Sequence, residues 1–478
     1  INKSITLDGN GHKLTSKAGR AINVSGAVAA TIKDLTIEAS GERAINVIQG
    51  ASNVTISNVK ATAANYAVNV AASAAGSTIE IENSDLTGLN TVNVAAANVN
   101  VTIDNSVVNN VDNTAVESYA ALKLSIEAEN STITVTNTTI NVAGDSVKAT
   151  VSSETGIITI DGTDAEVKYD VAYISYGANA YTFSSLQAAI DAAQAGETVV
   201  LIRDIEITDT VVVGEGKVIT LDLAGHTITA KDNTNKNYSA INVNKGNLTI
   251  TGNGTITVEA TINSGWGRYS AVVANNQGTL TIENGTFEHL GGTDMAYVID
   301  TLTNGGIGDA TTTINGGTFT SPYRALRQFA NSSTKENTLV INGGTISGAN
   351  KAVWVQSSNA NANQANLTIT GEAVIDGDVY LWAPENGATN GIVVSMKAES
   401  INGTVVNALV DRALVNVNGY YSLVEAVASV NGTNYESLEA AIAAAQEGET
   451  VVLLKDVELK EILVINKSIT LDGNGHKL

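Results

Sequence analysis

Side chains that could bind a sugar or dock a protein gather in the second half of the chain. Short motifs place Arg327, Trp354 and Tyr380 at the same position of successive repeats, a set that we call a column. Val273 and Val298 are expected before them in this column, and Trp382 stands two residues after Tyr380. Exposed aromatic rings beside arginine and carboxylates are typical of sugar stacking and protein docking. The pattern predicts a ligand-binding face on Arg327, Trp354, Tyr380 and Trp382. The alternative is that some rings only cover edges or pack under loops.

A second column consists of asparagines. Tetrads such as Ala21-Ile22-Asn23-Val24 recur with spacings of 23, 23, 24 and 24 residues. Apolar residues at the second and fourth positions should face inward, which leaves the third position outside. The outward column is predicted to contain Asn23, Asn46, Asn69 and Asn93, with Glu117 and Asn242 continuing the phase. Amide-to-amide hydrogen bonding along a stack is the favoured interpretation, and a flat polar face that binds a glycan or another fibre is the alternative.

The histidines follow a third pattern. Gly11-His12, Gly225-His226 and Gly475-His476 stand at the same place in related segments, which favours a structural turn over a metal or catalytic pair of Asp8 and His12. Asp8-Gly9-Asn10-Gly11 lacks the later glutamate of a calcium loop. The chain contains no cysteine, so thiolate chemistry is excluded. We predict no catalytic residue, no metal and no cofactor.

Short alternating segments must position these columns. Runs such as Val54-Thr55-Ile56 and Leu248-Thr249-Ile250 predict strands with one buried face. Asn or Gly follows two residues later and predicts a left-handed bend, after which a further strand such as Thr286-Phe287-Glu288 begins. The predicted bend residues are Asn58, Asn83, Asn105, Gly252, Asn284, Gly316, Gly343 and Gly371, with Ala39 as the exception. Three strands in each turn predict an all-β fold, a right-handed parallel β-helix.

Two amphipathic segments divide the chain into modules. Residues 185–201 match residues 437–453 at an offset of 252. Each is predicted to form a short helix that covers the open end of the β-helix after it, because solenoids need caps. For the first helix we expect an apolar face that consists of Leu186, Ala189, Ile190 and Ala193. Ser184 or Ser185 is the expected N-cap, and Gly196 is the expected left-handed C-cap. The predicted modules are 1–178, which lacks its own helical cap, 179–432, and 433–478, the cap and first turn of the next module.

The same fourteen residues form Ile1 to Leu14 and Ile465 to Leu478, so the chain resembles one period of a longer array. The formal charge of −22, from 48 acidic and 26 basic residues, argues against nucleic acid and anionic membranes as partners. The sequence contains no run of eighteen apolar residues, so we predict no membrane insertion in this segment.

The cap string from the tyrosine before each helix to Thr-Val-Val-Leu, followed by Ile-Thr-Leu-Asp-x-x-Gly-His, resembles helix-capped, pectate-lyase-like β-helix modules of large bacterial cell-surface and adhesin-like proteins. The resemblance implies the fold and a secreted or cell-surface location, and it does not imply a ligand. Enzymes of this fold class would need clustered acidic residues with an arginine or lysine base, or a Gly-His-Gly with an Arg-Ile-Lys element, and neither set is present.

The sequence therefore predicts a structural or adhesive surface protein without catalysis, one period of a tandem β-solenoid stalk or fibre. The expected partners are neighbouring modules of the same chain, other copies in a fibre, or glycans of a host or the environment. The alternative is a β-helix protein that binds or cleaves polysaccharides on the face of Arg327, Trp354 and Tyr380.

Overall fold

A computed structural model describes residues 1–111, 119–144, 146–176, 179–231, 237–259, 269–291, 295–304, 308–332, 334–357, 364–384 and 391–478. Glu117 of the asparagine column lies outside these residues. The chain divides into two compact units, Ile1–Ala189 and Ile190–Leu478. The first boundary predicted from sequence, 178/179, precedes this division, and the predicted boundary at 432/433 stays a prediction.

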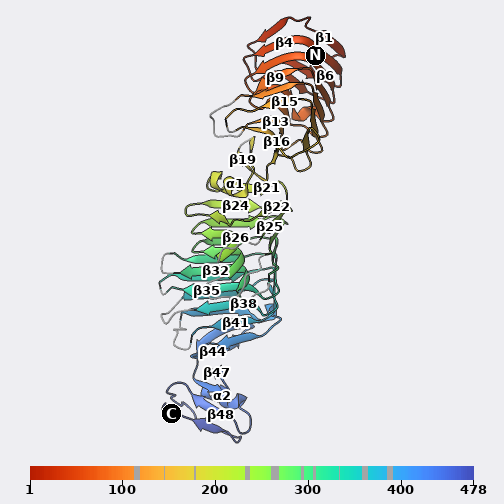
Figure 1. The fold of residues 1–478 in the computed structure, drawn as a ribbon. Coiled ribbons are helices and arrows are strands. Elements are labelled where there is room, and N and C mark those ends of the chain that lie inside the picture. The colour runs from red at the N-terminus through yellow and green to blue at the C-terminus, as the bar shows by residue number, and fades with distance from the viewer. Residues whose placement is uncertain are drawn as a thin grey trace. The chain divides into compact units, whose positions relative to one another are not determined.

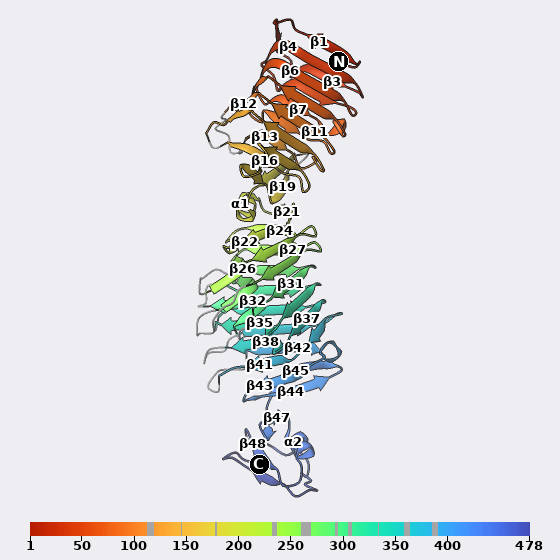
Figure 2. The ribbon, with the colours of Figure 1, turned by 45° about the vertical axis from the view of Figure 1, so that its right-hand side comes forward.

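Both units are built from stacked turns of parallel strands, about 13 turns in total (Figures 1 and 2). In unit 2, consecutive strands of one turn belong to different sheets, whereas in unit 1 the first two strands of a turn share one sheet and the third belongs to another. Most strands pair in parallel with the strand one turn later. Every backbone group that points along the stack can therefore find a partner in the next turn. The predicted all-β fold, a parallel β-solenoid with short helices, is confirmed.

Unit 1 contains two sheets and a terminal hairpin. The first sheet comprises β1 (Ile5–Asp8), β2 (Lys13–Ser16), β4 (Ala29–Ala39), β6 (Asn53–Ala63), β8 (Thr78–Glu82), β9 (Asp85–Gly88), β11 (Asn100–Asp104), β12 (Val107–Asn110), β14 (Thr132–Thr136), β15 (Thr139–Asn141) and β17 (Ile157–Ile160). The second comprises β3 (Arg20–Ser25), β5 (Arg43–Ile48), β7 (Tyr66–Val70), β10 (Val92–Val94), β13 (Ala120–Leu124), β16 (Val147–Val151) and β18 (Val167–Tyr169). A short 3₁₀ helix, η1 (Ala72–Ala74), follows β7, and β19 (Ala172–Tyr176) and β20 (Asn179–Phe183) form an antiparallel hairpin.

Unit 2 has three parallel stacks. The first comprises β21 (Thr198–Leu201), β24 (Val218–Asp222), β27 (Asn247–Thr251), β30 (Thr279–Ile282), β33 (Ala310–Ile314), β36 (Glu336–Ile341), β39 (Gln364–Ile369) and β42 (Ile392–Lys397), and it ends on the antiparallel strands β45 (Tyr420–Glu425) and β44 (Arg412–Val417). The second comprises β22 (Ile205–Ile207), β25 (Thr227–Ala230), β28 (Thr255–Val258), β31 (Thr286–His289), β34 (Thr318–Ser321), β37 (Thr345–Gly348) and β40 (Val374–Asp376).

The third stack of unit 2 comprises β23 (Val211–Val213), β26 (Asn237–Asn244), β29 (Tyr269–Asn276), β32 (Ala296–Asn304), β35 (Arg324–Asn331), β38 (Lys351–Ser357), β41 (Val379–Trp382) and β43 (Val405–Ala408). A short 3₁₀ helix, η2 (Ala398–Ser400), follows β42. Near the end of the chain, β46 (Ala428–Val430), β47 (Thr433–Tyr435), β48 (Thr450–Leu453) and β49 (Thr470–Asp472) form a separate small sheet.

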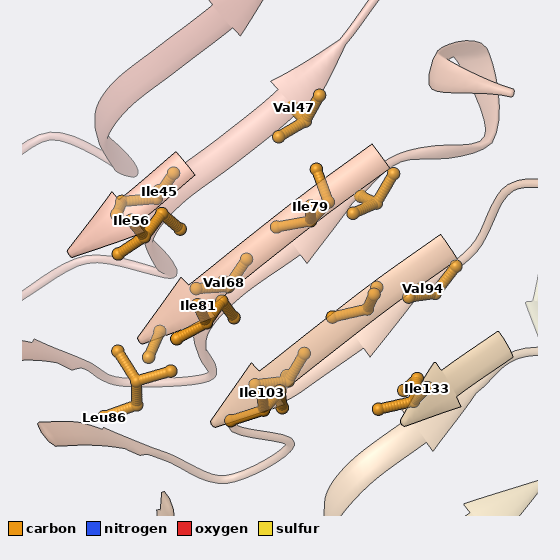
Figure 3. Close-up of a cluster of buried hydrophobic side chains, with 14 of the residues drawn as sticks. Ile45, Val47, Ile56, Val68, Ile79, Ile81, Leu86, Val94, Ile103 and Ile133 are labelled. Carbon is orange, nitrogen blue, oxygen red and sulfur yellow. The ribbon is translucent and has the colours of Figure 1, made fainter. Parts of the chain in front are cut away.

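The core is a column of aliphatic side chains from successive turns. In unit 1, Ile56, Ile81 and Ile103 are buried register partners on β6, β8 and β11 and lie above one another along the stack (Figure 3). In unit 2 the rings of Phe287 and Phe319 stack in parallel, with centroids 5.0 Å apart. Each fully buried side chain of this size contributes about 1.5–3 kcal/mol, so stability accumulates turn by turn.

Left-handed residues mark the bends of successive turns, within the long strands β4 and β6 and between strands in the later turns. Asn58, Asn83 and Asn105 have φ near +50°, as predicted, and Asp34 replaces the expected exception Ala39. In three later turns the prediction was one residue early, because the positive φ angles belong to Gly285, Gly317 and Gly344 instead of Asn284, Gly316 and Gly343. Consecutive residues there both tolerate such backbones, so composition alone did not identify the one that adopts them.

The two helices are α1 (Leu186–Ala192) and α2 (Leu438–Ala444). The predicted apolar face of α1 is buried, and Ser185 caps it by accepting a hydrogen bond from the Ala188 amide. Ser437 does the same for Ala440 in α2. Gly196, the predicted left-handed C-cap of α1, has a φ of +87° but lies in the turn before β21, four residues after the last helical residue Ala192.

Helix α2 packs on the strand that begins the next turn. Leu438, Ala441 and Ile442 of α2 form one buried cluster with Ala428 of the hairpin β46–β47 and Val451 of β48. The hairpin also pairs with β48, through antiparallel β46. The hairpin therefore covers one edge of β48, and helix α2 covers the apolar face of the turn that contains β48.

Candidate ligand-binding face on strands β35, β38 and β41

The predicted aromatic column lies on the third stack of unit 2. Arg327, Trp354 and Tyr380 are register partners on β35, β38 and β41. The strand register before Arg327 differs from the prediction, because Asp300 and Ala274 occupy the column instead of Val298 and Val273. The turns of unit 2 vary in length, so counting residues between motifs shifted the alignment by one or two positions.

Arg327 is buried and cannot present its charge to a ligand. Its Nε and Nη2 atoms donate to the two carboxylate oxygens of Asp300 at 2.8 and 2.5 Å. Arg327 is 5% exposed and Asp300 is fully buried. The guanidinium carbon also lies 4.3 Å from the centre of the Tyr297 ring. The prediction of Arg327 as a binding residue is therefore wrong, since its donors serve an internal ion pair.

Trp354 is half-buried beneath a different arginine. The guanidinium carbon of Arg324 lies 4.3 Å from the centre of the indole ring, and Arg324 also lies 5.3 Å from the Tyr323 ring. Tyr297 lies on another side of the indole, 6.5 Å between centroids, and burial raises the pKa of its hydroxyl. One face of Trp354 is thus occupied by a cation, which limits the ring surface left for a sugar.

Tyr380 is paired with Lys351 in the same way. The Lys351 Nζ lies 4.7 Å from the centre of the Tyr380 ring and donates to Asn350 at 2.8 Å. Burial lowers the pKa of Lys351, and the charge of Arg324 lowers it further, while Asp378 opposes both. Lys351 and Arg324 are register partners on β38 and β35. The face therefore consists of adjacent cations over aromatic rings.

The sequence did not assign Arg324 and Lys351 to the site. Each stands three residues before a predicted site residue, Arg327 and Trp354 respectively, so the common spacing was a usable signal. Trp382 is half-buried and is the register partner of Gln356, one side-chain position along the same face. The four predicted residues thus lie on one stack, and three of them keep some exposed surface.

His289, on β31, lies outside this face and is structural. Its Nδ1 accepts a hydrogen bond from the Gly291 amide at 3.2 Å, so the neutral ring carries its proton on Nε2, which donates to the Ser270 hydroxyl at 2.8 Å. Burial lowers the pKa of His289 to about 4. Both ring nitrogens are used by the fold, which leaves neither for proton transfer to a substrate.

The repeated Gly-His histidines contact carboxylates of the preceding segment. Nδ1 of His226 lies 3.6 Å from Asp204, and Nδ1 of His476 lies 3.4 Å from Asp456. The same aspartates accept hydrogen bonds from the backbone amides of Thr227 and Lys477. The recurrence of both contacts indicates a structural role for this histidine.

The asparagine column of unit 1 forms a continuous hydrogen-bonded ladder. Asn46 donates to Asn23, Asn69 donates to Asn46, and Asn93 donates to Asn69, each at 2.8 Å between Nδ2 and Oδ1. The hydroxyl of Ser125 extends the ladder by donating to Asn93 at 3.1 Å. Asn46, Asn69 and Asn93 are between 0 and 6% exposed. The alternative of an open amide face that binds a glycan is contradicted for these three residues.

Asn242 does not continue this ladder in unit 2. Its register partners on β23 and β29 are Val212 and Ala274, so the neighbouring turns offer it no amide. Its Oδ1 is buried and makes no hydrogen bond. The assignment of Asn242 to a polar ladder is therefore wrong.

Within the described ranges, no group of three or more histidine, aspartate or glutamate residues could hold a metal ion. In the same part of the chain, no helix is long and apolar enough to cross a membrane. Comparisons with protein-family models, curated proteins and solved structures found no significant match to this chain.

Proposed function

We propose that the chain is a non-catalytic structural and adhesive protein, one period of a tandem β-solenoid. The observation that supports this proposal is the recurrence of one set of contacts between a cap and the turn it covers. Lys217 donates to the carbonyls of Asp191 and Ala193 at the end of α1, and Lys467 donates to those of Ala443 and Ala445 at the end of α2.

The backbone contacts of the two caps recur as well. The Gly196 amide donates to Val218 O and the Thr220 amide to Glu197 O; in the second copy Gly448 donates to Ser468 O and Thr470 to Glu449 O. A substrate site is not expected to recur at every cap, whereas a joint between modules must do so. The repeated joint thus favours a role in building an extended array.

The hydrogen bonds between successive turns are consistent with a stiff stalk. The strands are continuous along each stack, and buried ladders such as Asn23 to Asn93 join successive turns. We propose an extracellular location for this array, which the resemblance of its cap motif to capped β-helix modules of bacterial surface proteins supports. Its partners are then neighbouring modules, other copies of the chain, or extracellular glycans.

Electron microscopy of the purified chain and of native surface material tests the structural role. Filaments with features that repeat once per period are the expected result. An assay for new reducing ends on a panel of polysaccharides should remain at background. Sustained polysaccharide cleavage would contradict the non-catalytic proposal.

Polysaccharide binding or cleavage is the second candidate function, favoured by the aromatic surface of β38 and β41. Trp354, Tyr380 and Trp382 line adjacent turns and are half-buried, with Lys351 over one of the rings. We expect binding without cleavage, in keeping with the non-catalytic function proposed above.

The Trp382→Ala variant tests this second function in a polysaccharide pull-down. We expect it to reduce binding about tenfold or more, since an aromatic stacking contact contributes on the order of 1–2 kcal/mol. Tyr66→Ala is the control, because Tyr66 is another half-buried aromatic residue, which lies beneath Arg43 on unit 1. Equal binding by the two variants would exclude this face as the binding site.

A further inference from the structure

The outward face of the first stack of unit 2 contains two columns without charged side chains. The register of its seven strands from β24 to β42 defines both columns (Figure 2). The first, which we call the valine-ended column, consists of Val218, Asn247, Thr279, Thr311, Thr338, Asn366 and Val393. The second consists of Thr220, Thr249, Thr281, Thr313, Val340, Thr368 and Ser395. These side chains are exposed or half-buried, so they form an uncharged surface on a chain with 48 acidic and 26 basic residues.

The valine-ended column has the same order of residue types in both directions. Outward from its centre at Thr311 come a threonine, an asparagine and a valine on either side. The end residues Val218 and Val393 are 43% and 56% exposed. A face that contacts its own copy across a two-fold axis brings each position opposite the position at the same distance beyond the centre. With the axis along β33, threonine meets threonine, amide meets amide, and valine meets valine.

Charges on one rim of the face agree with this axis. Asp222 follows Thr220 by two residues on β24, and Lys397 follows Ser395 by two residues on β42. A two-fold axis along β33 brings Asp222 of each copy opposite Lys397 of the other. Lys397 also forms an ion pair with Glu399 at 2.5 Å, so the rim pair contributes more to orientation than to affinity.

Two comparable faces of the chain lack this symmetry. In unit 1 the position five residues before the left-handed bend, which Asn247 occupies before Gly252, is held in successive turns by Ala29, Asn53, Thr78, Asn100, Thr132 and Ile157. On the second stack of unit 2, the column that contains Thr320 includes three carboxylates, those of Glu206, Glu288 and Asp376. The solenoid fold therefore does not by itself impose a symmetric, uncharged face.

We propose that this face binds the same face of a second copy of the chain, in an antiparallel, side-by-side dimer with its two-fold axis along β33. Two acidic chains repel each other, and an uncharged face is where they can approach closely. Packed sheets lie about 10 Å apart, which brings short side chains such as threonine and valine into contact. This inference rests on the proposed structural function and names how two copies of such a stalk associate.

The size of the face predicts a weak dimer. Seven strands about 4.8 Å apart, with about 15 Å of each strand, give roughly 450 Å² on each copy. The two copies together bury about 900 Å², which is typical of transient interfaces. We expect a dissociation constant between about 10 μM and 1 mM, and closed dimers instead of filaments, because an isologous contact occupies both faces. In a tandem array, several modules would pair at once and strengthen the contact.

Sedimentation equilibrium of the full chain, up to about 1 mM, measures this association, with circular dichroism to check folding. Salt should strengthen the dimer, because it screens the repulsion between two acidic chains. Thr311→Lys and Thr311→Glu each place like charges on the axis, so either variant alone should dimerise at least about tenfold more weakly. An equal mixture of the two should recover the dimer, because opposite charges then meet. Thr320→Lys, at an exposed threonine of the second stack, is the control and should associate like the parent chain.

Cross-linking tests the antiparallel direction. The chain contains no cysteine, so single cysteines can be introduced at Asn247 and Asn366. Backbones of packed sheets are too far apart for a disulfide, so the reagent is a short bis-maleimide. A mixture of Asn247→Cys and Asn366→Cys should cross-link. Asn247→Cys alone should not, because four strand spacings, about 19 Å, separate the two copies of this residue along the stack.

A salt-strengthened dimer with these effects at Thr311 and this cross-linking pattern would support the proposal. A chain that stays monomeric at about 1 mM in high salt would overturn it. So would a dimer that Thr311→Lys leaves unchanged, or one in which Asn247→Cys cross-links to itself. Each of these negative results leaves the structural function in place, because that function is contradicted by polysaccharide cleavage and not by a monomeric chain.

Discussion

The column that begins with the tetrad asparagines in unit 1 and the column of Asn242 in unit 2 carry different kinds of side chain. In unit 1 the column holds a run of identical amides, Asn23 to Asn93, that bond to one another. In unit 2 the register column holds Asn242, Ala274, Asp300, Arg327, Trp354 and Tyr380. A ladder of like residues extends over any number of turns, whereas unlike residues must find complementary partners, such as Arg327 with Asp300. Unit 1 therefore repeats itself, and unit 2 carries the more distinctive surface.

The ion pair of unit 2 should give the largest effect. Asp300→Ala leaves Arg327 buried without its carboxylate and should destabilise unit 2 by about 3–5 kcal/mol. Hydrogen exchange of unit 2 peptides in a urea series measures this loss. The double variant Asp300→Leu with Arg327→Met should recover much of it. Asp209→Ala, at an exposed aspartate, is the control, and an equal loss there would remove the special role of the buried pair.

The buried histidine predicts a pH dependence of unit 2. The pKa of His289 falls to about 4 in the folded protein, so the unfolded chain takes up the proton first as the pH drops. The corresponding stability is complete above pH 6.5 and is lost between about pH 6.5 and 4, by about 3 kcal/mol.

Unit 2 peptides should lose exchange protection over this range more steeply in the parent chain than in His289→Gln. Glutamine is a suitable replacement because it can keep both hydrogen bonds without titrating. Parallel pH profiles for the two proteins would show that His289 is not protonated on unfolding in this range.

The ladder of unit 1 predicts a smaller effect that depends on position. Asn69→Ala removes two amide hydrogen bonds and leaves buried groups of Asn46 and Asn93 with fewer partners, at a cost of about 2 kcal/mol. Asn23→Ala, at the exposed end, should cost only about 0.5–1 kcal/mol. Equal losses measured by urea denaturation would show that burial does not strengthen the ladder.

Asn242 provides a comparison with the ladder of unit 1, because it is also an asparagine but its neighbours in the register column are not amides. Asn242→Ala should change the stability of unit 2 by less than about 0.5 kcal/mol, since its Oδ1 makes no hydrogen bond to lose. The same denaturation series measures this change. A loss as large as that of Asn69→Ala would mean that the asparagine acts through something other than its amide neighbours.

The fold could be predicted from sequence because each turn repeats one pattern. Constant spacing in unit 1 aligned the ladder correctly, and alternation identified the inward residues. Alternation gives the direction of a side chain but not what covers it, so the burial of Asn46 and Asn69 was missed. The burial of Arg327 was missed for a related reason: its partner Asp300 belongs to another turn, and turns of unequal length hid their common register.

The structure of a two-period chain tests the repeat most directly: residues 1–464 joined to a second complete copy, imaged by cryo-electron microscopy. In a continuous repeat, the strand Thr470–Asp472 at the junction should pair on one edge with Thr450–Leu453 and on the other with the second copy's equivalent of β4. A junction strand that pairs with only one of these neighbours, so that the cap and the following solenoid do not meet, would contradict it.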